Sequence, residues 1–561
     1  MKKKLVYYIL PLLIFIGCSE DFTKTPAIGA LSDDALKNAQ GVDLLLTGAY
    51  SALDGVVGEN GGNGFAVSAD NWWFDVLSDD AHKGSTDGDQ ADLFLIETYS
   101  FTSGNPYILG KWEALYAGVN RANNVINVIN GIEGGDFNGK LAEARFLRGY
   151  FNFELQKIFG NPSYISEENY ANTEFNQPNS GPIWAQIEAD QQFAVDNLPD
   201  TQAEAGRPTS WTAKAFLGKT YIFQEKWSEG LSILQDVIQN GPYALNTEFV
   251  DNFRAGGENS AESIFAVQFA ADDGQSYNGN VGSTLNFPGG GPFNSCCGFY
   301  QPTQDLVNAY QTQNGLPLLD TYGNTDVAND YGIESADAFT PESGPLDPRL
   351  DYTVGRRGID YNGFGINPGK EWIRASAADI SGPYLPKKNI YYAGEDVNMG
   401  TGGWGQQHSG VNYNIMRYSG LLLLAAEAAA ETGDLETALD YVNMVRERAK
   451  NMTYVKKVDG DGDAANYQIE LYDSFASKDF AIKAIRFERR LELALEGHRF
   501  FDLTRWDIAA QVLNSYVQKE GRTITNFPGK VSTFKETNSL LPIPLNAIDL
   551  SGGVLTQNPG Y

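Results

Sequence analysis

Residues 211–245 read WTAKAFLGKTYIFQEKWSEGLSILQDVIQNGPYAL and contain the pattern of two short helices packed as a pair. The positions that carry this pattern are Leu217, Gly218, Tyr221, Gly230, Leu234 and Pro242. In such a unit a small residue lies where the two helices touch, and a proline closes the pair. The stretch therefore predicts a helical scaffold rather than a sheet.

These offsets are close to those of a tetratricopeptide repeat, and a weaker copy follows in LLLLAAEAAAETGDLETALDYVNMVRERA, residues 421–449. Ala426, Gly433, Ala438 and Val442 stand there at the corresponding steps. Residues 110–131 and 140–160 predict two further helical pairs. Four pairs separated by long loops indicate a mostly α chain, a helical-repeat scaffold with insertions. Such arrays bind partners, but the repeat does not identify the ligand.

Residues 488–506, ERRLELALEGHRFFDLTRW, combine acids, arginines and a histidine as a catalytic cluster does. One helical face carries Phe487, Leu491, Ala494, Leu495 and His498, and a second carries Arg489, Glu492, Glu496 and Arg499. On the second face each glutamate has an arginine within one turn, which keeps the acid ionised. A glycosidase needs one carboxyl group held protonated. We therefore interpret the segment as structural.

The chain starts MKKKLVYYILPLLIFIGCSEDF, with three lysines, an apolar run from Leu5 to Ile16 and then Gly17 and Cys18. This is typical of a secretory signal and too short to span a membrane as a helix. A cysteine after a small residue resembles a bacterial lipoprotein cleavage box. We expect residues 1–17 to be a lipoprotein signal peptide and Cys18 to be lipidated. Ordinary secretion with Cys18 free is the alternative, and both place the protein outside the cytoplasm.

The other two cysteines, Cys296 and Cys297, are adjacent. They allow no disulfide framework. They form either a vicinal disulfide or two free thiols, and the geometry of a disulfide between neighbours favours the thiols.

The composition excludes some partners. The chain has 561 residues and a formal net charge of −30, which repels nucleic-acid phosphates and anionic membrane surfaces. Aromatic residues make up 12% of the chain and there are 60 glycines, many of them in loops. Long loops with aromatic and glycine residues on a rigid scaffold are typical of binding surfaces.

Together these segments resemble the SusD/RagB family, the surface glycan-binding lipoproteins of Bacteroidetes. Besides the lipoprotein start, the matching motifs lie at residues 111–126 (KWEALYAGVNRANNVI), 142–164 (AEARFLRGYFNFELQKIFGNPSY), 416–433 (MRYSGLLLLAAEAAAETG), 485–506 (IRFERRLELALEGHRFFDLTRW) and 541–561 (LPIPLNAIDLSGGVLTQNPGY). The resemblance implies a mostly α, SusD-like fold with four tetratricopeptide-like helix pairs, long loops and minor β-hairpins. Residues 18–561 would form one domain, with loop-rich insertions notably at 60–108, 165–182, 270–415 and 451–478.

The resemblance also implies a function. Family members lack catalysis and act as the lid of a SusC-like TonB-dependent transporter that imports oligosaccharides. Ser19, Glu20 and Asp21 resemble the family's surface-export signal, so we expect a lipid-anchored protein on the cell surface, in the outer membrane. The resemblance implies no cofactor.

Sugar binding needs aromatic platforms and planar polar groups. Each platform that covers on the order of 100 Å² contributes about 2 kcal/mol, so we expect micromolar to millimolar affinity. Three loops supply candidates. The first, residues 69–93, has Trp72, Trp73 and Asp80. By resemblance, Tyr99, Phe101 and Asn105 of the second, residues 98–107, take binding positions, with tyrosine and phenylalanine where the starch-binding member has tryptophans.

By the same resemblance, the third loop, residues 291–306, offers Phe299 or Tyr300, and Trp404 is a further candidate. For each of these rings the alternative is packing in the core. A half-buried strand at Trp72 and Trp73 would point one ring inward and the other outward, so at most one of them is a platform.

One metal site is a hypothesis. Asp459, Asp461, Asp463 and Glu470 stand at positions one, three, five and twelve of an EF-hand-like loop, which suits calcium. Ala464 replaces the glycine of the sharp turn, so an acidic solvated loop is the alternative.

Three functions remain. The sequence favours a non-catalytic glycan-binding lipoprotein that serves a transporter. A secreted glycan-active enzyme is disfavoured because no isolated carboxylate pair is evident. A structural or adhesive surface protein, such as a fimbria-associated helper, is the main alternative. The charge favours neutral or cationic sugars, unless Arg356, Arg357, Lys387 and Lys388 form a basic patch.

Overall fold

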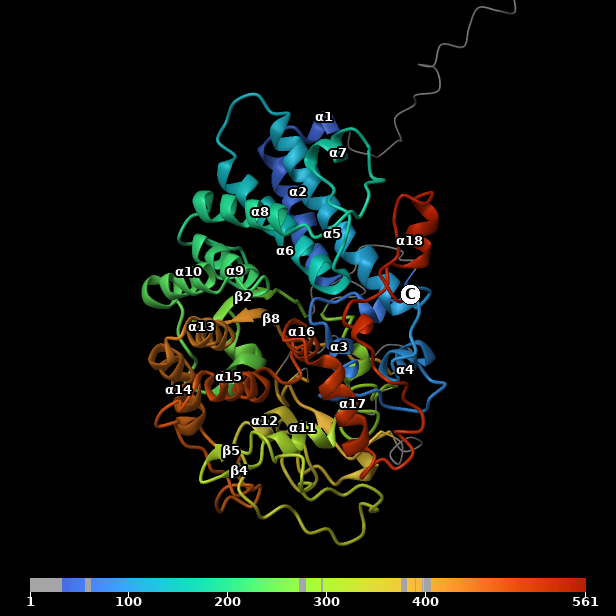
Figure 1. Cartoon of the computed structure of the whole chain (residues 1–561), viewed down its shortest axis with the longest axis vertical. Coiled ribbons are helices and arrows are strands. Elements are labelled where there is room, and N and C mark those ends of the chain that lie inside the picture. Colours follow the sequence, from blue (N-terminus) through green and yellow to red (C-terminus); the bar gives the residue numbers. More distant parts are fainter. Residues whose placement is uncertain are drawn as a thin grey trace, which may run out of the picture.

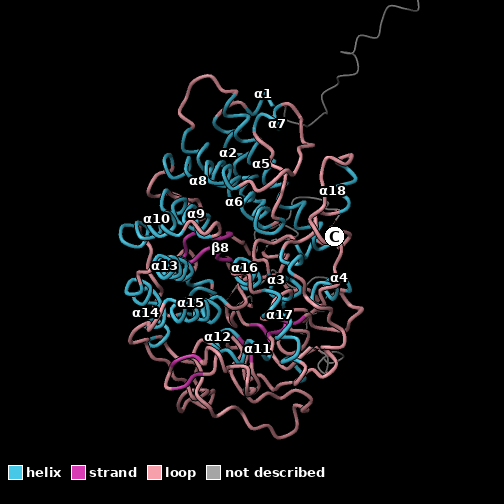
Figure 2. The backbone as a smooth tube through the Cα atoms, in the orientation of Figure 1, coloured by secondary structure: helices cyan, strands magenta, loops and turns pink. Residues whose placement is uncertain are grey.

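The structure is a computed structural model that describes residues 33–55, 62–271, 279–293, 296–374, 381–388, 390–395, 397 and 405–561. The expected signal peptide, Cys18 and Trp404 lie outside these residues. The described chain is mainly helical, as predicted, with loops gathered toward one end of the molecule (Figures 1 and 2).

Long helices form a continuous array on one side of the molecule (Figure 1). They are α2 (Ala39–Ser51), α5 (Pro106–Asn130), α6 (Asn138–Phe159), α8 (Trp184–Asn197), α9 (Ser210–Ile222), α10 (Trp227–Asn240), α13 (Tyr418–Thr432), α14 (Leu435–Asn451) and α15 (Lys478–Leu493). The pairs α2 with α5, α6 with α8, α9 with α10 and α13 with α14 pack in that order, and α15 packs on α13. The predicted mostly α scaffold of packed helix pairs is therefore confirmed, although two of the pairs do not lie where the sequence placed them.

The pair α9 and α10 shows why residues 211–245 fold as they do. Thr209 and Thr212 form a capping box at the start of α9. A Cβ atom on Gly218 would lie 2.4 Å from Cδ2 of Leu234, so only glycine lets the two helices approach this closely. The small residue at the helix contact was predicted correctly. The second copy also forms a pair, and Gly433 ends α13 with a φ of 92°.

Two of the predicted pairs differ in detail. Residues 110–131 and 140–160 each lie in a single helix, α5 and α6, and not in a pair of helices. α5 packs on α2 and α6, and α6 packs on α8. The partner helices α2 and α8 lie elsewhere in the sequence, so the local pattern did not identify them.

Short elements make up the rest. The short helices are α1 (Asp33–Leu36), α3 (Trp72–Val76), α4 (Ala91–Glu97), α7 (Glu167–Ala171), α11 (Gln304–Ala309), α12 (Leu350–Thr353), α16 (Arg499–Arg505), α17 (Ala509–Glu520) and α18 (Leu545–Leu550). The strands pair antiparallel as β1 (Ala81–His82) with β3 (Gln301–Pro302), β2 (Ser263–Val267) with β8 (Tyr413–Arg417), β4 (Thr312–Gln313) with β5 (Leu316–Pro317), and β6 (Val354–Gly355) with β7 (Leu385–Pro386). Except for β4 with β5, these pairs join distant segments.

The hydrophobic interior of the described residues has a main core and three smaller clusters, of which the one under the loops bears on function. The main core runs through the helical array and includes residues from Val42 to Ile543. The cluster under the loops is built around Phe287, Phe293, Tyr361 and Tyr391. The loops at 287–293 and 361–373 therefore pack on a hydrophobic cluster that is separate from the main core.

The segment 488–506 is not one helix. α15 ends at Leu493 and α16 begins at Arg499, so Glu496 and Arg499 do not share a helical face with Glu492. Glu492 is wholly buried, and its carboxylate contacts Arg417 at 2.5 Å, Arg349 at 2.9 Å and Arg448. Burial opposes ionisation here, but the three arginine charges hold the pKa of Glu492 well below its usual range. The structural interpretation is confirmed, although the partners come from other segments.

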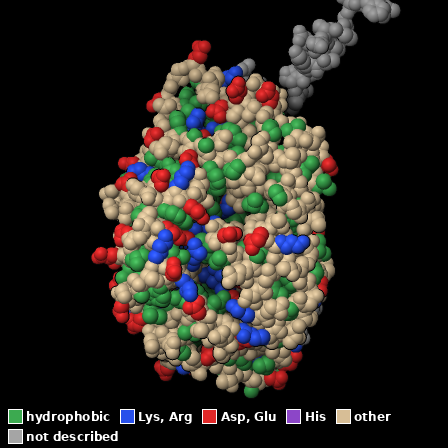
Figure 3. Space-filling view, in the orientation of Figure 1, with side chains coloured by type: hydrophobic (Ala, Val, Ile, Leu, Met, Phe, Trp, Pro, Cys, Tyr) green, Lys and Arg blue, Asp and Glu red, His purple; other side chains and the backbone are tan. Residues whose placement is uncertain are grey.

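The hypothetical basic patch does not form an exposed cluster, because Arg357 alone of its four residues is half-buried, and it donates to the carbonyls of Ser335 and Asp337. Arg356, Lys387 and Lys388 are buried. Arg356 binds Asp351 through two nitrogens at 2.8 Å, and Lys388 donates to Glu496 at 2.7 Å. Basic side chains do gather near the middle of the face in Figure 3. Among the exposed or half-exposed lysines, Lys483 of α15 pairs with Asp320 and Lys519 of α17 with Asp305.

Candidate functional site

The three loops predicted to bind a ligand lie together. The first and third loops pair through β1 and β3, with Ala81 opposite Pro302. The second loop packs against the first, because the Asn105 amide donates to the carbonyl of Asp92 at 2.9 Å and the Tyr107 hydroxyl to Gln90 at 2.9 Å. The three predicted loops are thus neighbours in the fold.

The tryptophans of the first loop lie in the interior. Trp72 and Trp73 begin the helix α3, not a half-buried strand, and each is 1% exposed. The indole of Trp72 donates to the carbonyl of Gly282 at 2.8 Å, and that of Trp73 donates to Ala66 at 3.1 Å. The expectation of one inward and one outward ring is wrong, because a helical turn buries both. In this conformation both rings pack in the core.

The aromatic residues of the second loop are also buried. Tyr99 meets the ring of Phe534 edge-on at 5.1 Å, and Phe101 packs against Tyr561 at 6.1 Å. Asn105 caps α5, since its side-chain oxygen accepts from the backbone N–H of Tyr107 at 2.9 Å. These three side chains therefore hold the loop against the scaffold in this structure.

In the third loop Tyr300 is fully buried and Phe299 nearly so. The Tyr300 hydroxyl donates to Asp75 at 2.6 Å. Asp80, from the first loop, is equally buried and binds Arg490 at 2.9 Å. None of these predicted residues offers a ring face or a carboxylate to solvent in the described structure.

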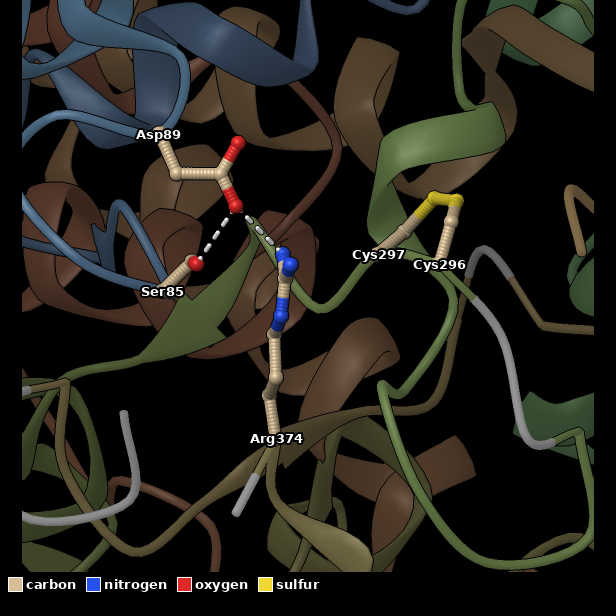
Figure 4. The surroundings of a disulfide bond; sticks show 5 residues. All are labelled: Ser85, Asp89, Cys296, Cys297 and Arg374. Atoms are coloured by element: carbon tan, nitrogen blue, oxygen red, sulfur yellow. Dashed lines mark hydrogen bonds and ion pairs between the residues drawn. A yellow bond between two sulfur atoms is a disulfide. The ribbon is translucent and has the colours of Figure 1, made fainter. Parts of the chain in front are cut away.

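A different set of side chains reaches the surface beside these loops. Asp89 and Arg374 form an ion pair at 2.7 Å with side chains 37% and 30% exposed, and the Ser85 hydroxyl donates to Asp89 at 2.8 Å (Figure 4). Trp372, two residues before Arg374, is half-buried. We call Ser85, Asp89, Trp372 and Arg374 the loop site.

Glycines let four loop segments converge at the loop site. A Cβ atom on Gly84 would lie 1.6 Å from the carbonyl oxygen of Gly298. One on Gly289 would lie 2.7 Å from Cβ of Arg374, and one on Gly291, where φ is +68°, would lie 2.6 Å from the indole of Trp372. The backbones approach so closely that side chains are excluded. The positions of Trp372 and Arg374 thus follow from the glycine runs.

Positive charge surrounds the ring of Phe299 under the loop site. The Nζ of Lys83 lies 5.6 Å and the guanidinium carbon of Arg374 5.4 Å from its centroid. Burial lowers the pKa of Lys83 to about 8, even though nearby carboxylates oppose this shift. Its ammonium donates to the carbonyls of Gly84 and Thr86 at 3.1 and 2.7 Å, which braces the turn that carries Asp89.

Cys296 and Cys297 are joined in a disulfide beside the loop site (Figure 4). The expectation that two thiols are favoured is therefore wrong. Gly289 lies between Arg374 and Cys297, since its Cβ would be 3.0 Å from the carbonyl oxygen of Cys297. The disulfide is thus part of the same packed set of loops.

The loop site can bind a polyhydroxylated ligand. A guanidinium and a carboxylate held 2.7 Å apart can match neighbouring hydroxyl groups, and an indole can cover the apolar face of a sugar ring. The sequence analysis missed Asp89, Trp372 and Arg374. The signal was the segment NPGKEWIR, residues 367–374, where a tryptophan and an arginine two residues apart follow proline and glycine.

The calcium hypothesis gains no support from the described residues, among which no group of three or more potential ligand residues is placed to hold a metal ion. Asp463 binds Lys456 and Glu470 binds Lys450, both at 2.5 Å, while Asp459 and Asp461 are exposed. Calcium binding stays a hypothesis, and calorimetry after chelation tests it. Within the described ranges no helix is long and apolar enough to cross a membrane.

Comparisons with known proteins identify relatives along the whole chain. A family model described as "SusD family" matches residues 261–561, and one described as "Starch-binding associating with outer membrane" matches residues 40–222. SusD-like protein P2 of Formosa agariphila is 24% identical over 586 residues, which cover 100% of both chains.

Solved structures share the fold. A SusD-like protein of Bacteroides fragilis has a TM-score of 0.69 at 20% identity, over 96% of this chain and 100% of the other. Surface glycan-binding protein A of Bacteroides thetaiotaomicron, solved in complex with laminarihexaose, has a TM-score of 0.59 at 18% identity, over 93% and 99% of the two chains.

Proposed function

The chain belongs to the SusD family, and on that premise we propose that it binds oligosaccharide or polysaccharide at the cell surface without catalysis and passes it to a SusC-like TonB-dependent transporter. The ligand class is supported by the glycan-binding relatives, one of them solved with laminarihexaose. The matched family description names association with the outer membrane. Lipidation of Cys18 would supply the anchor.

The observation that carries the proposal is the half-exposed ion pair of Asp89 and Arg374, with the half-buried Trp372 two residues before Arg374 in the sequence. In the interior of this protein buried carboxylates and guanidiniums are paired to hold the fold together, whereas this pair lies at the surface of converging loops. Its hydrogen-bonding groups are partly in water and can exchange water for ligand hydroxyls at little cost.

The buried acid Asp75 illustrates why a raised pKa alone does not make a hydrolase. A glycosidase needs a protonated carboxyl group that substrate can reach. Burial raises the pKa of Asp75 well above its usual range, but its side chain is fully buried and accepts a hydrogen bond from Tyr300. Asp75 is therefore closed to substrate in this structure, whereas Asp251 and Glu258, whose pKa values burial also raises, are half-buried.

Isothermal titration calorimetry of the soluble form starting at Ser19 tests the proposal. The ligands are oligosaccharides from starch, laminarin, inulin and chitin, and the variants are Arg374→Ala and Trp372→Ala. We expect saturable heat with one glycan class. Loss of the hydrogen bonds from Arg374, at about 1.5–3 kcal/mol for a charged donor, would weaken loop-site affinity roughly 10- to 100-fold.

Arg522→Ala is the matched control. Arg522 forms a surface ion pair with Asp326 at 2.7 Å, its side chain is 40% exposed, and it lies outside the loop site. Its variant should bind like the wild type. Tight binding to a protein partner, with no heat of binding for any of the oligosaccharides, would instead favour the structural or adhesive alternative.

A further inference from the structure

A groove of about 390 Å³ lies outside the loop site, between α5, α18 and residues 163–177. This volume is within the range of small-ligand sites, about 300–1,000 Å³. None of the four loop-site residues lines it. The groove is therefore a second concave surface that the proposed function does not use.

Aromatic rings form one wall of the groove. Trp112 and Tyr116, one turn apart on α5, lie with ring centroids 4.7 Å apart. Trp112 is anchored against Phe159 at 4.8 Å, and the Tyr116 hydroxyl donates to the carbonyl of Ser163 at 2.8 Å. These contacts hold both rings in place before any ligand arrives, which limits the entropy lost on binding.

Phe175 supplies a ring at the mouth of the groove. Its side chain is 46% exposed, and it meets Tyr170 edge-on at 5.9 Å. A phenylalanine ring that remains half in water keeps free apolar surface that a ligand can cover.

The polar groups of the groove are mostly amides. Asn120, Asn176, Gln177 and Asn546 line it. The side-chain oxygen of Asn120 is buried and has no hydrogen-bond partner in the part of the chain that the structure describes. A buried acceptor without a partner is unfavourable, and a ligand hydroxyl can satisfy it.

The described residues that line the groove carry little charge. Among its described residues there is no lysine, arginine or histidine, and one carboxylate, Glu113, accepts from the backbone N–H of Gly62 at 3.1 Å. An anionic ligand would find no cation to pair with. The lining therefore suits a neutral ligand.

Exposed aliphatic side chains extend the apolar surface next to the groove. Leu545, Leu550 and Val554 are 49%, 78% and 38% exposed, and hydrophobic side chains reach the surface near α18 in Figure 3. Concentration of exposed apolar surface at one concave place is typical of a binding site.

We propose that this groove is a second carbohydrate-binding site, which takes a segment of a neutral oligosaccharide chain. The half-buried ring of Tyr116 and the exposed ring of Phe175 cover the apolar ring faces, while Trp112, which is 7% exposed, supports Tyr116 from behind. The amides of Asn120, Gln177 and Asn546 bind the hydroxyl groups. The inference rests on the proposed function in that the ligand is again a glycan. Two sites on one chain would raise the apparent affinity for a long polysaccharide through avidity.

The test uses calorimetry with two neutral probes, maltohexaose and laminarihexaose, and an oligogalacturonate as charged counterpart. Phe175→Ala removes an exposed ring with little risk to folding, and Phe175→Trp keeps a platform. Leu44→Ala is the matched control, because Leu44 is 57% exposed on α2 away from the groove. All are made in the wild type and on the Arg374→Ala background, which removes the loop site.

We expect Arg374→Ala to retain one site per chain for a neutral probe. In that background Phe175→Ala should weaken binding about 5- to 20-fold, while Phe175→Trp and Leu44→Ala leave it unchanged. If Arg374→Ala abolished binding of the neutral probes and Phe175→Ala left it unchanged, the groove inference would be overturned. The proposed function would stand. Binding of the oligogalacturonate with equal affinity would overturn the neutral ligand class.

If the wild type gave no heat of binding with any saccharide, both the proposed function and the groove inference would be overturned. Self-association that Leu550→Ala abolishes, with no dependence of glycan affinity on Phe175, would make the groove a protein-docking surface and overturn the inference alone.

Discussion

Arg490 donates through Nε to Oδ1 of Asp80 at 2.9 Å, and both side chains are buried although 410 positions of sequence separate them. The same guanidinium binds Asp79 at 3.1 Å and Asp305 at 3.0 Å. α15 thus holds the first loop and α11 together. The carboxylate of Asp80, predicted to face a glycan, instead joins the loop to the scaffold.

Asp79→Asn is expected to destabilise the protein strongly. Asp79 accepts two hydrogen bonds from Arg499, each 2.8 Å long, and contacts Arg490 as well. Without the negative charge of Asp79, the guanidiniums of Arg490 and Arg499, one buried and the other nearly so, each lose an ionic partner. We expect the free energy of unfolding, measured by urea denaturation at pH 7, to fall by about 3–5 kcal/mol.

Asp320→Asn is its control. Asp320 pairs with Lys483 at 2.7 Å, but the two side chains are 70% and 49% exposed. Water screens this pair, so the midpoint of denaturation should not move measurably. Equal effects of the two substitutions would show that burial does not set the strength of these pairs.

His82 should make stability depend on pH. Its Nδ1 lies 2.8 Å from Glu97 and its Nε2 lies 2.9 Å from Glu520. Burial alone would lower the pKa of His82, but the hydrogen bonds and charges of the two glutamates outweigh it and raise the pKa to about 9. The folded protein then holds a proton that the unfolded chain releases near pH 6.5. This contribution is complete below pH 6.5 and is lost as pH rises toward 9.

The measurement is the difference in unfolding free energy between wild type and His82→Gln, from pH 6 to pH 9.5. The difference isolates His82, because burial lowers the pKa of Lys219 to about 7 and of Lys111 to about 8, and these groups change stability in the opposite direction over the same range. We expect the difference in unfolding free energy between the wild type and His82→Gln to decrease as the pH rises. A constant difference would contradict the ion pairing of His82.

Gly84→Ala is expected to disturb the loop site. Its Cβ would lie 1.6 Å from the carbonyl oxygen of Gly298, so the two loops must separate. We expect a loss of about 1–3 kcal/mol in unfolding free energy and weaker glycan binding. Gly88→Ala, in the same loop, meets no atom within 4 Å and should leave both unchanged. A Gly84→Ala variant with normal stability would show that the loops do not approach this closely.

The disulfide gives a chemical prediction. In the soluble form starting at Ser19, Cys296 and Cys297 are the remaining cysteines. Because they are joined, the denatured protein should take up no iodoacetamide without a reductant, and two equivalents after reduction, by intact mass. Uptake of two equivalents without reduction would show free thiols.

The sequence by itself determined the helical scaffold. The pattern at Gly218, Leu234 and Gly433 is local, since Gly218 and its contact Leu234 are 16 positions apart in the sequence. The pairs α9 with α10 and α13 with α14 were therefore predictable. The three loops that were predicted to bind a ligand do lie near one another in the structure.

Only the tertiary structure decided which side chains of those loops reach solvent. Trp72 is buried and hydrogen-bonds to the carbonyl of Gly282, and Asp80 is buried and pairs with Arg490. Arg374 remains partly exposed, because glycines let its loop approach the loop that carries Asp89. The burial of a loop ring or carboxylate depends on partners that are hundreds of residues distant in sequence. Composition and spacing carry no information about such partners, because chain folding alone brings them together.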